Sequence, residues 1–399
     1  MHHAPLNIEP SRSAALDRLA RFVPLAGQSY AAGRNTDTGP DEPGAVSRLS
    51  PYLRYRLLTE CEVLSAVLSQ HSLRAAEKYV QEVLWRTYWK GWLEMRPSVW
   101  RSFVEERDRQ QGSFPNARAL AAAEHGTTGI EGFDDWAHEL VETGYLHNHA
   151  RMWFASIWIF TLRLPWALGA DFFLRHLLDA DAASNTLSWR WVAGLQTAGK
   201  NYLATADNIA RYTNGRFAPA GLACSAASLT EPPVAAARPL PMLERPDFST
   251  PSLLLVTPDD LHPQASLFDG IPVKTAMVTA GAELLWGDKA RSFVASAAID
   301  TAERTEALWN CPAEVIPTLD VAAIIAAAQA AGVRQVVTAY APVGLVADSL
   351  EALASALAAE GIALVRVRRH WDELFWPHAK KGYFAFKERI PELLREQGI

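Results

Sequence analysis

The stretch from Asp179 to Trp191, DADAASNTLSWRW, brings carboxylates, an amide and indoles into one short segment. Asp179 and Asp181 stand one residue apart, Asn185 follows them, and Trp189 and Trp191 close the stretch. Carboxylates in apolar surroundings are costly unless a partner satisfies them. The segment is therefore either a solvated loop that happens to carry tryptophans or the lining of a bound group.

Two further segments place chemically distinct side chains on one face of a predicted helix. Residues three and four apart are neighbours on a helix surface. By that spacing EVLWR aligns an acid, an indole and a cation, and HNHARM aligns an amide, a cation and a thioether. The residues are Glu82, Trp85 and Arg86 in the first segment and Asn148, Arg151 and Met152 in the second.

The HNHARM set lies beside Trp153, a combination that indicates a lined pocket rather than plain core. Each member also has a simpler interpretation. Met152 alone is typical core filler. Arg151 alone is typical of a structural ion pair, for which Asp179 or Asp181 would be a natural partner.

The segment SRLSPYL, from Ser47 to Leu53, has the composition of a helix start. Ser50 is expected to be the N-cap, with Pro51 at the first helical position. Hydroxyls and free backbone N–H groups at a helix start favour anions. A simple helix cap is the alternative.

Other site classes are disfavoured. His147 and His149 alternate and so do not share a helical face, and no other His or Cys stands at ligand spacing nearby, so we expect no metal site. No Ser–His–Asp set or nucleophile elbow appears. The three cysteines, Cys61, Cys224 and Cys311, are far apart and predict no disulfide framework. The sequence is rich in aromatic residues but lacks the residue sets of conventional acid–base catalysis, which disfavours a hydrolase-type mechanism.

The chain divides into two predicted domains. From Leu16 to about Arg216 apolar residues recur at helical spacing. Residues 219–250 are rich in Pro and Ala and predict a linker. After Ser252, short β-branched runs alternate with helical segments, which indicates a mostly parallel α/β sheet. We expect an all-α domain over 1–218 and an α/β domain over 251–399.

Composition limits the environments and partners that the sequence predicts for the protein. Of 399 residues, 21% are charged and 49% are hydrophobic, as in soluble globular proteins. Ten of the 14 tryptophans precede residue 220. The net charge of −6 argues against a generally basic nucleic-acid binder, although residues 1–218 are neutral and can present a local basic face. No signal peptide or bilayer-spanning run is seen, so we expect a cytoplasmic protein with no membrane contact. We assign no oligomeric state beyond a monomer by default.

Read in order, five motifs resemble the flavin-binding helical domain of the DNA photolyase/cryptochrome family. The resemblance covers residues 14–217, about half of the chain. Any one motif is weakly specific, but five in the family's order are strongly so. They are SYAAGRN, which holds Tyr30 and Arg34, then SRLSPYL, EVLWR, GYLHNHARM and DADAASNTLSWRW.

The resemblance implies a bound FAD. Asp179, paired with Arg151, and Asp181 would lie by the cofactor, and Asn185 would face the reactive flavin nitrogen. Ser47, Leu49 and Ser50 would hold the diphosphate, and Tyr30 and Arg86 complete the implied cofactor contacts. Trp189 and Trp166 would begin a chain of tryptophans that carries electrons to the excited flavin; the alternative is that they only pack the core.

The resemblance also implies a DNA substrate. Family members that repair cyclobutane pyrimidine dimers flip the dimer into a pocket over the flavin. The matching positions here hold the expected residue types, which makes UV-damaged DNA the implied partner. In the (6–4) class a histidine stands where Asn148 or Met152 stands here, which argues against that lesion. The pocket positions are Glu82, Trp85, Asn148, Met152 and Trp191. Basic residues that could hold phosphates are Arg34, Lys90, Arg190 and Lys200, although each alone is more typical of an ordinary solvated charge.

The sequence departs from the family pattern in several places. Val46 replaces a threonine before SRLS, and TLSW replaces a glycine-rich approach to Trp189. The family's closing motif after Trp191 is missing. The domain order is also inverted, since the family places its α/β antenna domain first. The segments TPDDLHP and HWDELFWPHAKKGYFAFKERIP resemble parts of that antenna domain, and the identity of any antenna chromophore stays open.

Three functions are compatible with these observations. The first is light-driven, FAD-dependent repair of cyclobutane pyrimidine dimers, in which Asn185, Glu82, Trp189 and Trp166 have the chemical roles. The second is a cryptochrome-like photoreceptor that binds FAD without repairing DNA, which the altered rim favours and the intact pocket set disfavours. The third is a light-independent flavoprotein or a structural helical domain.

Overall fold

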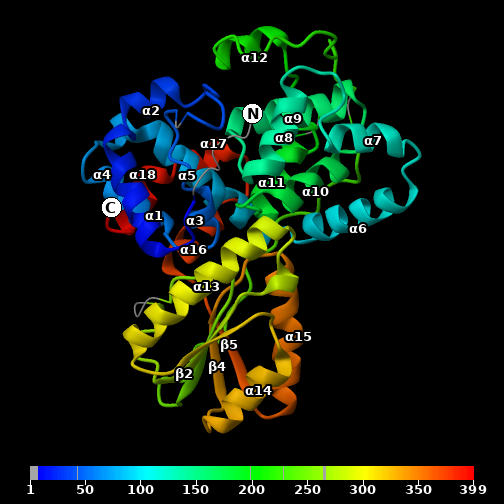
Figure 1. Cartoon of the computed structure of the whole chain (residues 1–399). Helices are drawn as coiled ribbons and strands as arrows, with labels where there is room; N and C mark the ends of the chain where they lie inside the picture. Colours follow the sequence, from blue (N-terminus) through cyan, green and yellow to red (C-terminus); the bar gives the residue numbers. More distant parts are fainter. Residues whose placement is uncertain (1–7, 43, 198, 228, 264–266) are drawn as a thin grey trace.

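The structure is a computed structural model, and it describes residues 8–42, 44–197, 199–227, 229–263 and 267–399. Figure 1 shows a helical part packed on the end of an α/β part. Helices make up the first half of the chain. They are α1 (Arg12–Phe22), α2 (Gln28–Gly33), α3 (Ser50–Arg54), α4 (Glu60–Leu68), α5 (Leu73–Glu94), α6 (Ser98–Ser113), α7 (Ala117–Glu124), α8 (Phe133–Thr143), α9 (Asn148–Ser156), α10 (Trp166–His176), α11 (Ala182–Val192) and α12 (Ala206–Tyr212).

The helices predicted to carry EVLWR and HNHARM are both present. Helix α5 starts at the N-cap Ser72, whose side chain accepts from the Ala75 amide, and runs for 22 residues. Helix α9 starts after His147, whose ring accepts from the His149 amide. It continues into a π-helical turn, η2 (Ile157–Thr161), so the predicted helix changes its period near its end.

The α/β part holds a five-stranded parallel sheet in the order β3-β2-β1-β4-β5. All five strands lie in the β-branched runs that predicted them. Helices α13 (Asp288–Trp309), α14 (Val321–Ala330) and α15 (Leu345–Ala359) connect the last four strands in turn. The strands are β1 (Ser252–Val256), β2 (Val273–Thr279), β3 (Ala313–Ile316), β4 (Gln335–Ala339) and β5 (Ala363–Val367).

The sheet buries both faces, as a parallel sheet must. Leu254 and Val256 of β1 share a core with Phe293 of α13 and with the helical part. Leu253 and Leu255 point to the opposite face, where they pack in a second core with α14 and α15. The period-two alternation of side chains along a strand explains this division.

The segment between the two parts has no regular structure. Among its described residues, 219–250 form no helix or strand. Few backbone groups tie it down, one being the Arg238 amide that donates to the Met95 carbonyl at 3.0 Å. Its Pro- and Ala-rich composition explains the lack of a ladder of hydrogen bonds.

After β5 the chain returns to the helical part. It forms α16 (His370–Phe375), the 3₁₀ turn η5 (Trp376–His378), α17 (Tyr383–Lys387) and α18 (Ile390–Glu396), and the first three pack against α5 (Figure 1). The Trp371 indole donates to the Thr87 hydroxyl at 3.2 Å. The last 30 residues thus belong spatially to the helical part.

Buried ion pairs join the two parts. Arg54 bonds Asp259 at 2.6 Å, and Arg56 bonds Asp260 at 3.5 Å while it also holds both carboxylate oxygens of Asp372, within the helical part, at 2.7 Å. Asp260 receives two hydrogen bonds from Arg369, at 2.5 and 2.6 Å. Charges removed from water need such partners, so this network fixes how the sheet meets the helices. Among the described residues, no helix is long and apolar enough to cross a membrane.

Candidate FAD site

The centre of the site is the ion pair between Arg151 on α9 and Asp179. The Arg151 guanidinium lies 3.1 Å from the Asp179 carboxylate, and Arg86 on α5 approaches the same carboxylate at 4.0 Å. Burial alone would raise the pKa of Asp179, but the charges of Arg151 and Arg86 outweigh it and hold the pKa below its ordinary value. Asp179 is therefore a fixed negative charge between two helices.

Asp181 is the second fixed carboxylate. It caps α11 by accepting from the Ser184 amide at 2.7 Å. Three cations surround it: Arg86 at 3.5 Å, Arg54 at 3.7 Å and Lys90 at 3.8 Å. Burial opposes ionisation, but these cations lower the pKa of Asp181 strongly. The acidic pair is thus a buried anchor and not a solvated loop.

Asn185 sits one turn into α11 and is only 7% exposed. Its Nδ2 donates to the Ala170 carbonyl at 2.8 Å. Of the two ends of the side-chain amide, only the NH2 group can donate to a carbonyl, so this bond fixes the amide with its oxygen turned away from α10. The amide oxygen is therefore the atom that Asn185 offers to a bound group.

Trp189 lies against α10 at a glycine. A Cβ added to Gly169 would lie 2.3 Å from Cη2 of Trp189, so only glycine allows the indole to come this close. Trp189 contacts Phe173 and Trp158, with ring centroids 5.1 and 6.2 Å away. Trp166, one turn before Gly169, contacts the ring of Phe103 at 5.7 Å.

The segment expected to hold the diphosphate precedes and begins α3. The structure corrects its predicted cap: Leu49 is the N-cap, and Ser50 already belongs to the helix, with Pro51 after it. The backbone here is held in a costly conformation, because Arg48 has φ of +52°. Arg48 keeps it by donating to carbonyls of Gly39, Pro40 and Glu42. Tyr30 on α2 is 4% exposed, and its ring centroid lies 5.0 Å from that of Tyr79.

Some buried donors in this cluster have no hydrogen-bond partner among the described residues. They include Nε1 of Trp189 and also Nη1 of Arg86, which lies 3.5 Å from Asp181 as an ion pair without a hydrogen bond. An unsatisfied buried N–H group costs roughly 1–3 kcal/mol, so native proteins keep few of them. A bound group rich in acceptor atoms would satisfy them, and the flavin and diphosphate of FAD are such groups. The residues present therefore fit FAD.

A second polar cluster lies next to the first. The Asn148 amide donates to Glu82 at 3.2 Å, and the Arg34 guanidinium lies 3.9 Å from the same carboxylate. Burial raises the pKa of Glu82, and Arg34 only partly opposes the shift. Glu82 and Arg86 are one turn apart on α5, and Asn148 and Arg151 are nearly one turn apart on α9. The two clusters therefore share the same pair of helices.

The aromatic members of the expected lesion pocket each meet a tyrosine. Trp85 is stacked by Tyr383 at 3.4 Å with an interplanar angle of 10°. Trp191 is 37% exposed and is stacked by Tyr202 at 5.7 Å. Met152 is partly exposed on α9. One face of each indole is thus occupied within the protein, and a ligand can stack only on the other.

Two of the basic residues expected to reach phosphates cannot do so. Lys90 is 2% exposed and lies by Asp181, and burial lowers its pKa. Arg190 is 3% exposed and pairs with Glu231. Those predictions are wrong because tertiary ion pairing withdrew both cations from the surface. Arg34 is partly exposed and Lys200 is exposed.

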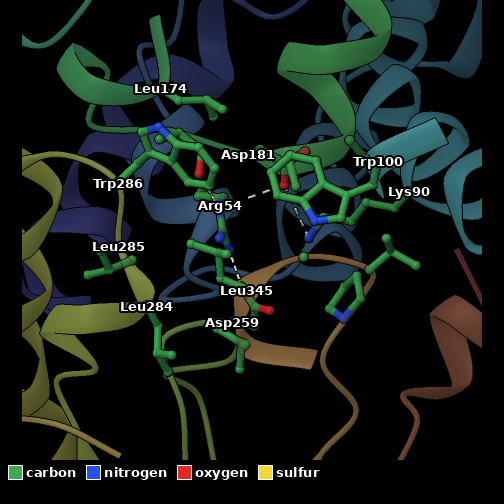
Figure 2. Close-up of a pocket in the computed structure, with 17 residues that line it drawn as sticks. Arg54, Lys90, Trp100, Leu174, Asp181, Asp259, Leu284, Leu285, Trp286 and Leu345 are labelled. Carbon is green, nitrogen blue, oxygen red and sulfur yellow. Dashed lines mark hydrogen bonds and ion pairs between the residues drawn. The ribbon is translucent and has the colours of Figure 1, made fainter. Parts of the chain in front are cut away.

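A cleft separates the helical part from the carboxyl edge of the sheet. Figure 2 shows Arg54 between Asp181 on one wall and Asp259 on the other, with Trp100 and Trp286 above the opening. The cleft borders the cluster described above through Asp181. Among the described residues, no group of three or more His, Cys, Asp or Glu could hold a metal ion.

Sequence reasoning missed several residues of the site. Arg54 supports Asp181, and Tyr202 and Tyr383 cover the two pocket indoles. Tyr383 lies in the Phe-rich closing segment that the sequence analysis had singled out. Its contact with Trp85 spans nearly 300 positions of the chain, which no local pattern reports.

Comparison with known proteins agrees with this geometry. Residues 79–215 match the sequence profile described as the FAD binding domain of DNA photolyase. The deoxyribodipyrimidine photo-lyase of Streptomyces griseus is 34% identical over 154 residues, which cover 38% of this chain and 33% of the relative. That of Synechococcus sp. is 32% identical over 198 residues, 47% of this chain and 39% of the relative. The chain therefore spans between a third and two-fifths of these curated relatives.

Among solved structures, a bacterial class III photolyase from Agrobacterium tumefaciens aligns with 51% of this chain and 44% of its own. Its sequence identity is 27% and its TM-score is 0.42. The family profile spans most residues of both polar clusters, from Glu82 on α5 to Trp191 on α11, whereas Arg34 and Arg54 precede it. Residues 79–215 of this chain are therefore similar to the FAD-binding domain of DNA photolyase.

Proposed function

We propose that the protein repairs cyclobutane pyrimidine dimers in DNA by a light-driven reaction at its bound FAD. The observation that carries the proposal is the shared framework of the two clusters. Arg86 and Arg151 anchor the acidic pair at the cofactor, and Glu82 and Asn148, on the same two helices, form a polar pair beside Trp85. A flipped base held by the second cluster would lie next to a flavin held by the first.

In this proposal the cofactor is held from several sides. Asp179 and Asp181, with Arg151 and Arg86, fix the protein charges around it. Ser47, Leu49 and Ser50 bind the diphosphate, Tyr30 lines the side, and the amide oxygen of Asn185 faces the flavin ring. FAD, bound in its reduced form, would absorb the light and supply an electron that passes to the dimer and afterwards returns to the cofactor.

The substrate is held by shape and polarity. Glu82 and Asn148 hydrogen-bond the base edges, while Trp85 and Trp191 stack on the dimer with their free faces and Met152 fills the space between. Stacking of a base on an aromatic side chain is worth about 1–3 kcal/mol, which offsets the cost of flipping it out of the duplex. Arg34 keeps Glu82 in place and lies beside the bound DNA strand. Trp189 and Trp166 carry electrons to oxidised FAD and so restore its reduced form.

A photoreceptor function is the second candidate. It is favoured by the burial and pairing of Lys90 and Arg190, which leaves the rim less basic than the sequence indicated. A weakly basic rim reduces the electrostatic part of DNA affinity.

Illumination of the purified, reduced protein with a dimer-containing oligonucleotide tests the two candidates. Loss of dimer in the light, and not in a dark control, is expected for the repair enzyme. If bound, reduced FAD gives no dimer loss, the repair proposal fails and the photoreceptor candidate takes its place.

A further inference from the structure

A short C-terminal segment borders the proposed lesion pocket. Tyr383 of α17 lies flat on Trp85, and its hydroxyl donates to the Gln81 carbonyl at 2.9 Å. The residue is 7% exposed. Because Gln81 and Trp85 flank Glu82 on α5, this segment forms one side of the pocket that the proposed function assigns to the dimer.

The segment is fixed along its length. The Arg96 guanidinium donates to the Lys380 carbonyl at 2.8 Å, and the Tyr88 hydroxyl donates to the Lys381 carbonyl at 2.9 Å. Further on, Phe386 is fully buried and Lys387 pairs with Glu77 at 3.0 Å. With its backbone held at these points, the segment is a rigid edge and not a movable lid.

The fixed edge presents a phenylalanine and two cations to solvent. Phe384 is 82% exposed, the largest exposed fraction of any aromatic side chain among the described residues. Lys380 and Lys381, three and two residues before the anchored Tyr383, are exposed. A single exposed apolar side chain is ordinary on a protein surface. This one is held rigidly next to two lysines at the border of a base-binding pocket.

We propose that Phe384, Lys380 and Lys381 form a second contact surface for the damaged DNA strand. Phe384 stacks on a base that flanks the flipped dimer, and the two lysines contact phosphates of the same strand. This combination of cations with an aromatic platform is how proteins hold unpaired nucleic acid. Apolar side chains also fill the gap that a displaced base leaves in a duplex. The proposal rests on the proposed function, since it takes the adjoining pocket as the dimer site.

The test measures binding of the FAD-loaded protein in the dark by fluorescence anisotropy. The probes are one labelled duplex with a single thymine dimer and the same duplex undamaged, each over a range of salt. Phe384→Ala should weaken binding of the dimer duplex by about 5- to 150-fold. The double variant Lys380→Gln/Lys381→Gln should weaken both duplexes and reduce the slope of log affinity against log salt by about 2.

Matched controls lie in the segment before β1 and on the α/β part. Phe248→Ala removes another exposed phenylalanine, and Lys274→Gln removes an exposed lysine at the start of β2. Both should bind like the unaltered protein. All altered side chains are exposed, and bound-flavin absorbance with the melting temperature confirms that each variant is folded.

The outcomes separate this surface from the proposed function. If the unaltered protein repairs dimers and the Phe384 and lysine variants still bind as it does, the surface is wrong and the function stands. If the protein binds DNA without repairing it and these variants weaken binding, the surface stands and the repair function fails. Binding that weakens equally in the controls would also overturn the surface.

Discussion

The Asn148 amide donates to the Glu82 carboxylate at 3.2 Å, which joins α9 to α5 at the border of the FAD site. The contact brings together two residues far apart in the chain that the family resemblance assigned to one base-binding pocket. Burial raises the pKa of Glu82, so this carboxyl sits where a neutral hydrogen-bonding partner suits it better than a second charge.

Asn148→Asp should therefore impair the pocket. Two carboxyls at this distance repel each other, so we expect affinity for a dimer-containing duplex to fall at least about tenfold at neutral pH and to recover partly in acid. Adding Glu82→Gln removes the repulsion and should restore part of the affinity. Anisotropy titrations in the dark measure both effects. Asn214→Asp, on an exposed turn, adds the same charge elsewhere; an equal loss there would show that total charge and not the pocket is responsible.

The ion pair between Arg151 and Asp179 gives a second prediction. Asp179→Asn leaves the Arg151 and Arg86 charges without their buried partner and should lower the free energy of unfolding by about 3–5 kcal/mol. FAD should also be lost during purification, which the flavin absorbance of the eluted protein measures. Glu351→Gln breaks the exposed pair with Arg366, in which the acid is 71% exposed, and should cost under about 1 kcal/mol.

The same pair has a pH signature. The pKa of Asp179 is held below its ordinary value, so its contribution to stability is present above that ordinary value and is lost as the pH falls through the lowered one. Asp179→Asn should flatten this acid limb of the unfolding curve. An unchanged limb would contradict the assignment of Asp179 as an ionised anchor.

A third prediction concerns the close approach of Gly169 to Trp189. In Gly169→Ala the new methyl group would lie 2.3 Å from the indole, so the ring must shift, at a cost of about 1–3 kcal/mol. Photoreduction of the bound flavin by an external thiol should slow, as it should in Trp189→Phe. Gly112→Ala, in a helix with nothing within 4 Å of the new atom, should not destabilise the protein. If Gly169→Ala and Trp189→Phe both show a normal photoreduction rate, Trp189 only packs the core.

Local sequence patterns predicted the elements well. The strands were legible because β-branched runs alternate with Ala-rich helical segments, and α5 was legible from its apolar period. The order of the five motifs also predicted that Asp179 would meet Arg151. Each of these features depends on residues close in the chain or on the arrangement of motifs in the family that the sequence resembles.

Features set by distant contacts could not be predicted in this way. Lys90 and Arg190 look like surface cations in sequence, and only their buried partners Asp181 and Glu231 reveal otherwise. The return of α17 to α5 depends on the stack of Tyr383 on Trp85, which has no local signal. Ser50 has the right type for an N-cap, yet the helix begins one residue earlier because Leu49 takes that position.

The last prediction concerns a buried acid away from the two clusters. Glu139 on α8 is 7% exposed, and its burial together with the nearby charge of Asp37 raises its pKa to about 8, against the opposing charges of Arg216 and Arg48. Between its ordinary pKa and the raised one, the folded protein holds a proton that the unfolded chain has lost. The stability due to this group is therefore complete in acid and is lost as the pH rises through about 8.

Glu139→Gln should remove that dependence. The variant is expected to be more stable than the unaltered protein at alkaline pH, by on the order of a few kcal/mol, and the difference should shrink as the pH falls toward 5. Urea unfolding at a series of pH values measures it, with Glu142→Gln on the exposed side of the same helix as the control. If the stability of the two variants follows the same pH course, the proton on Glu139 is not the cause of the pH dependence.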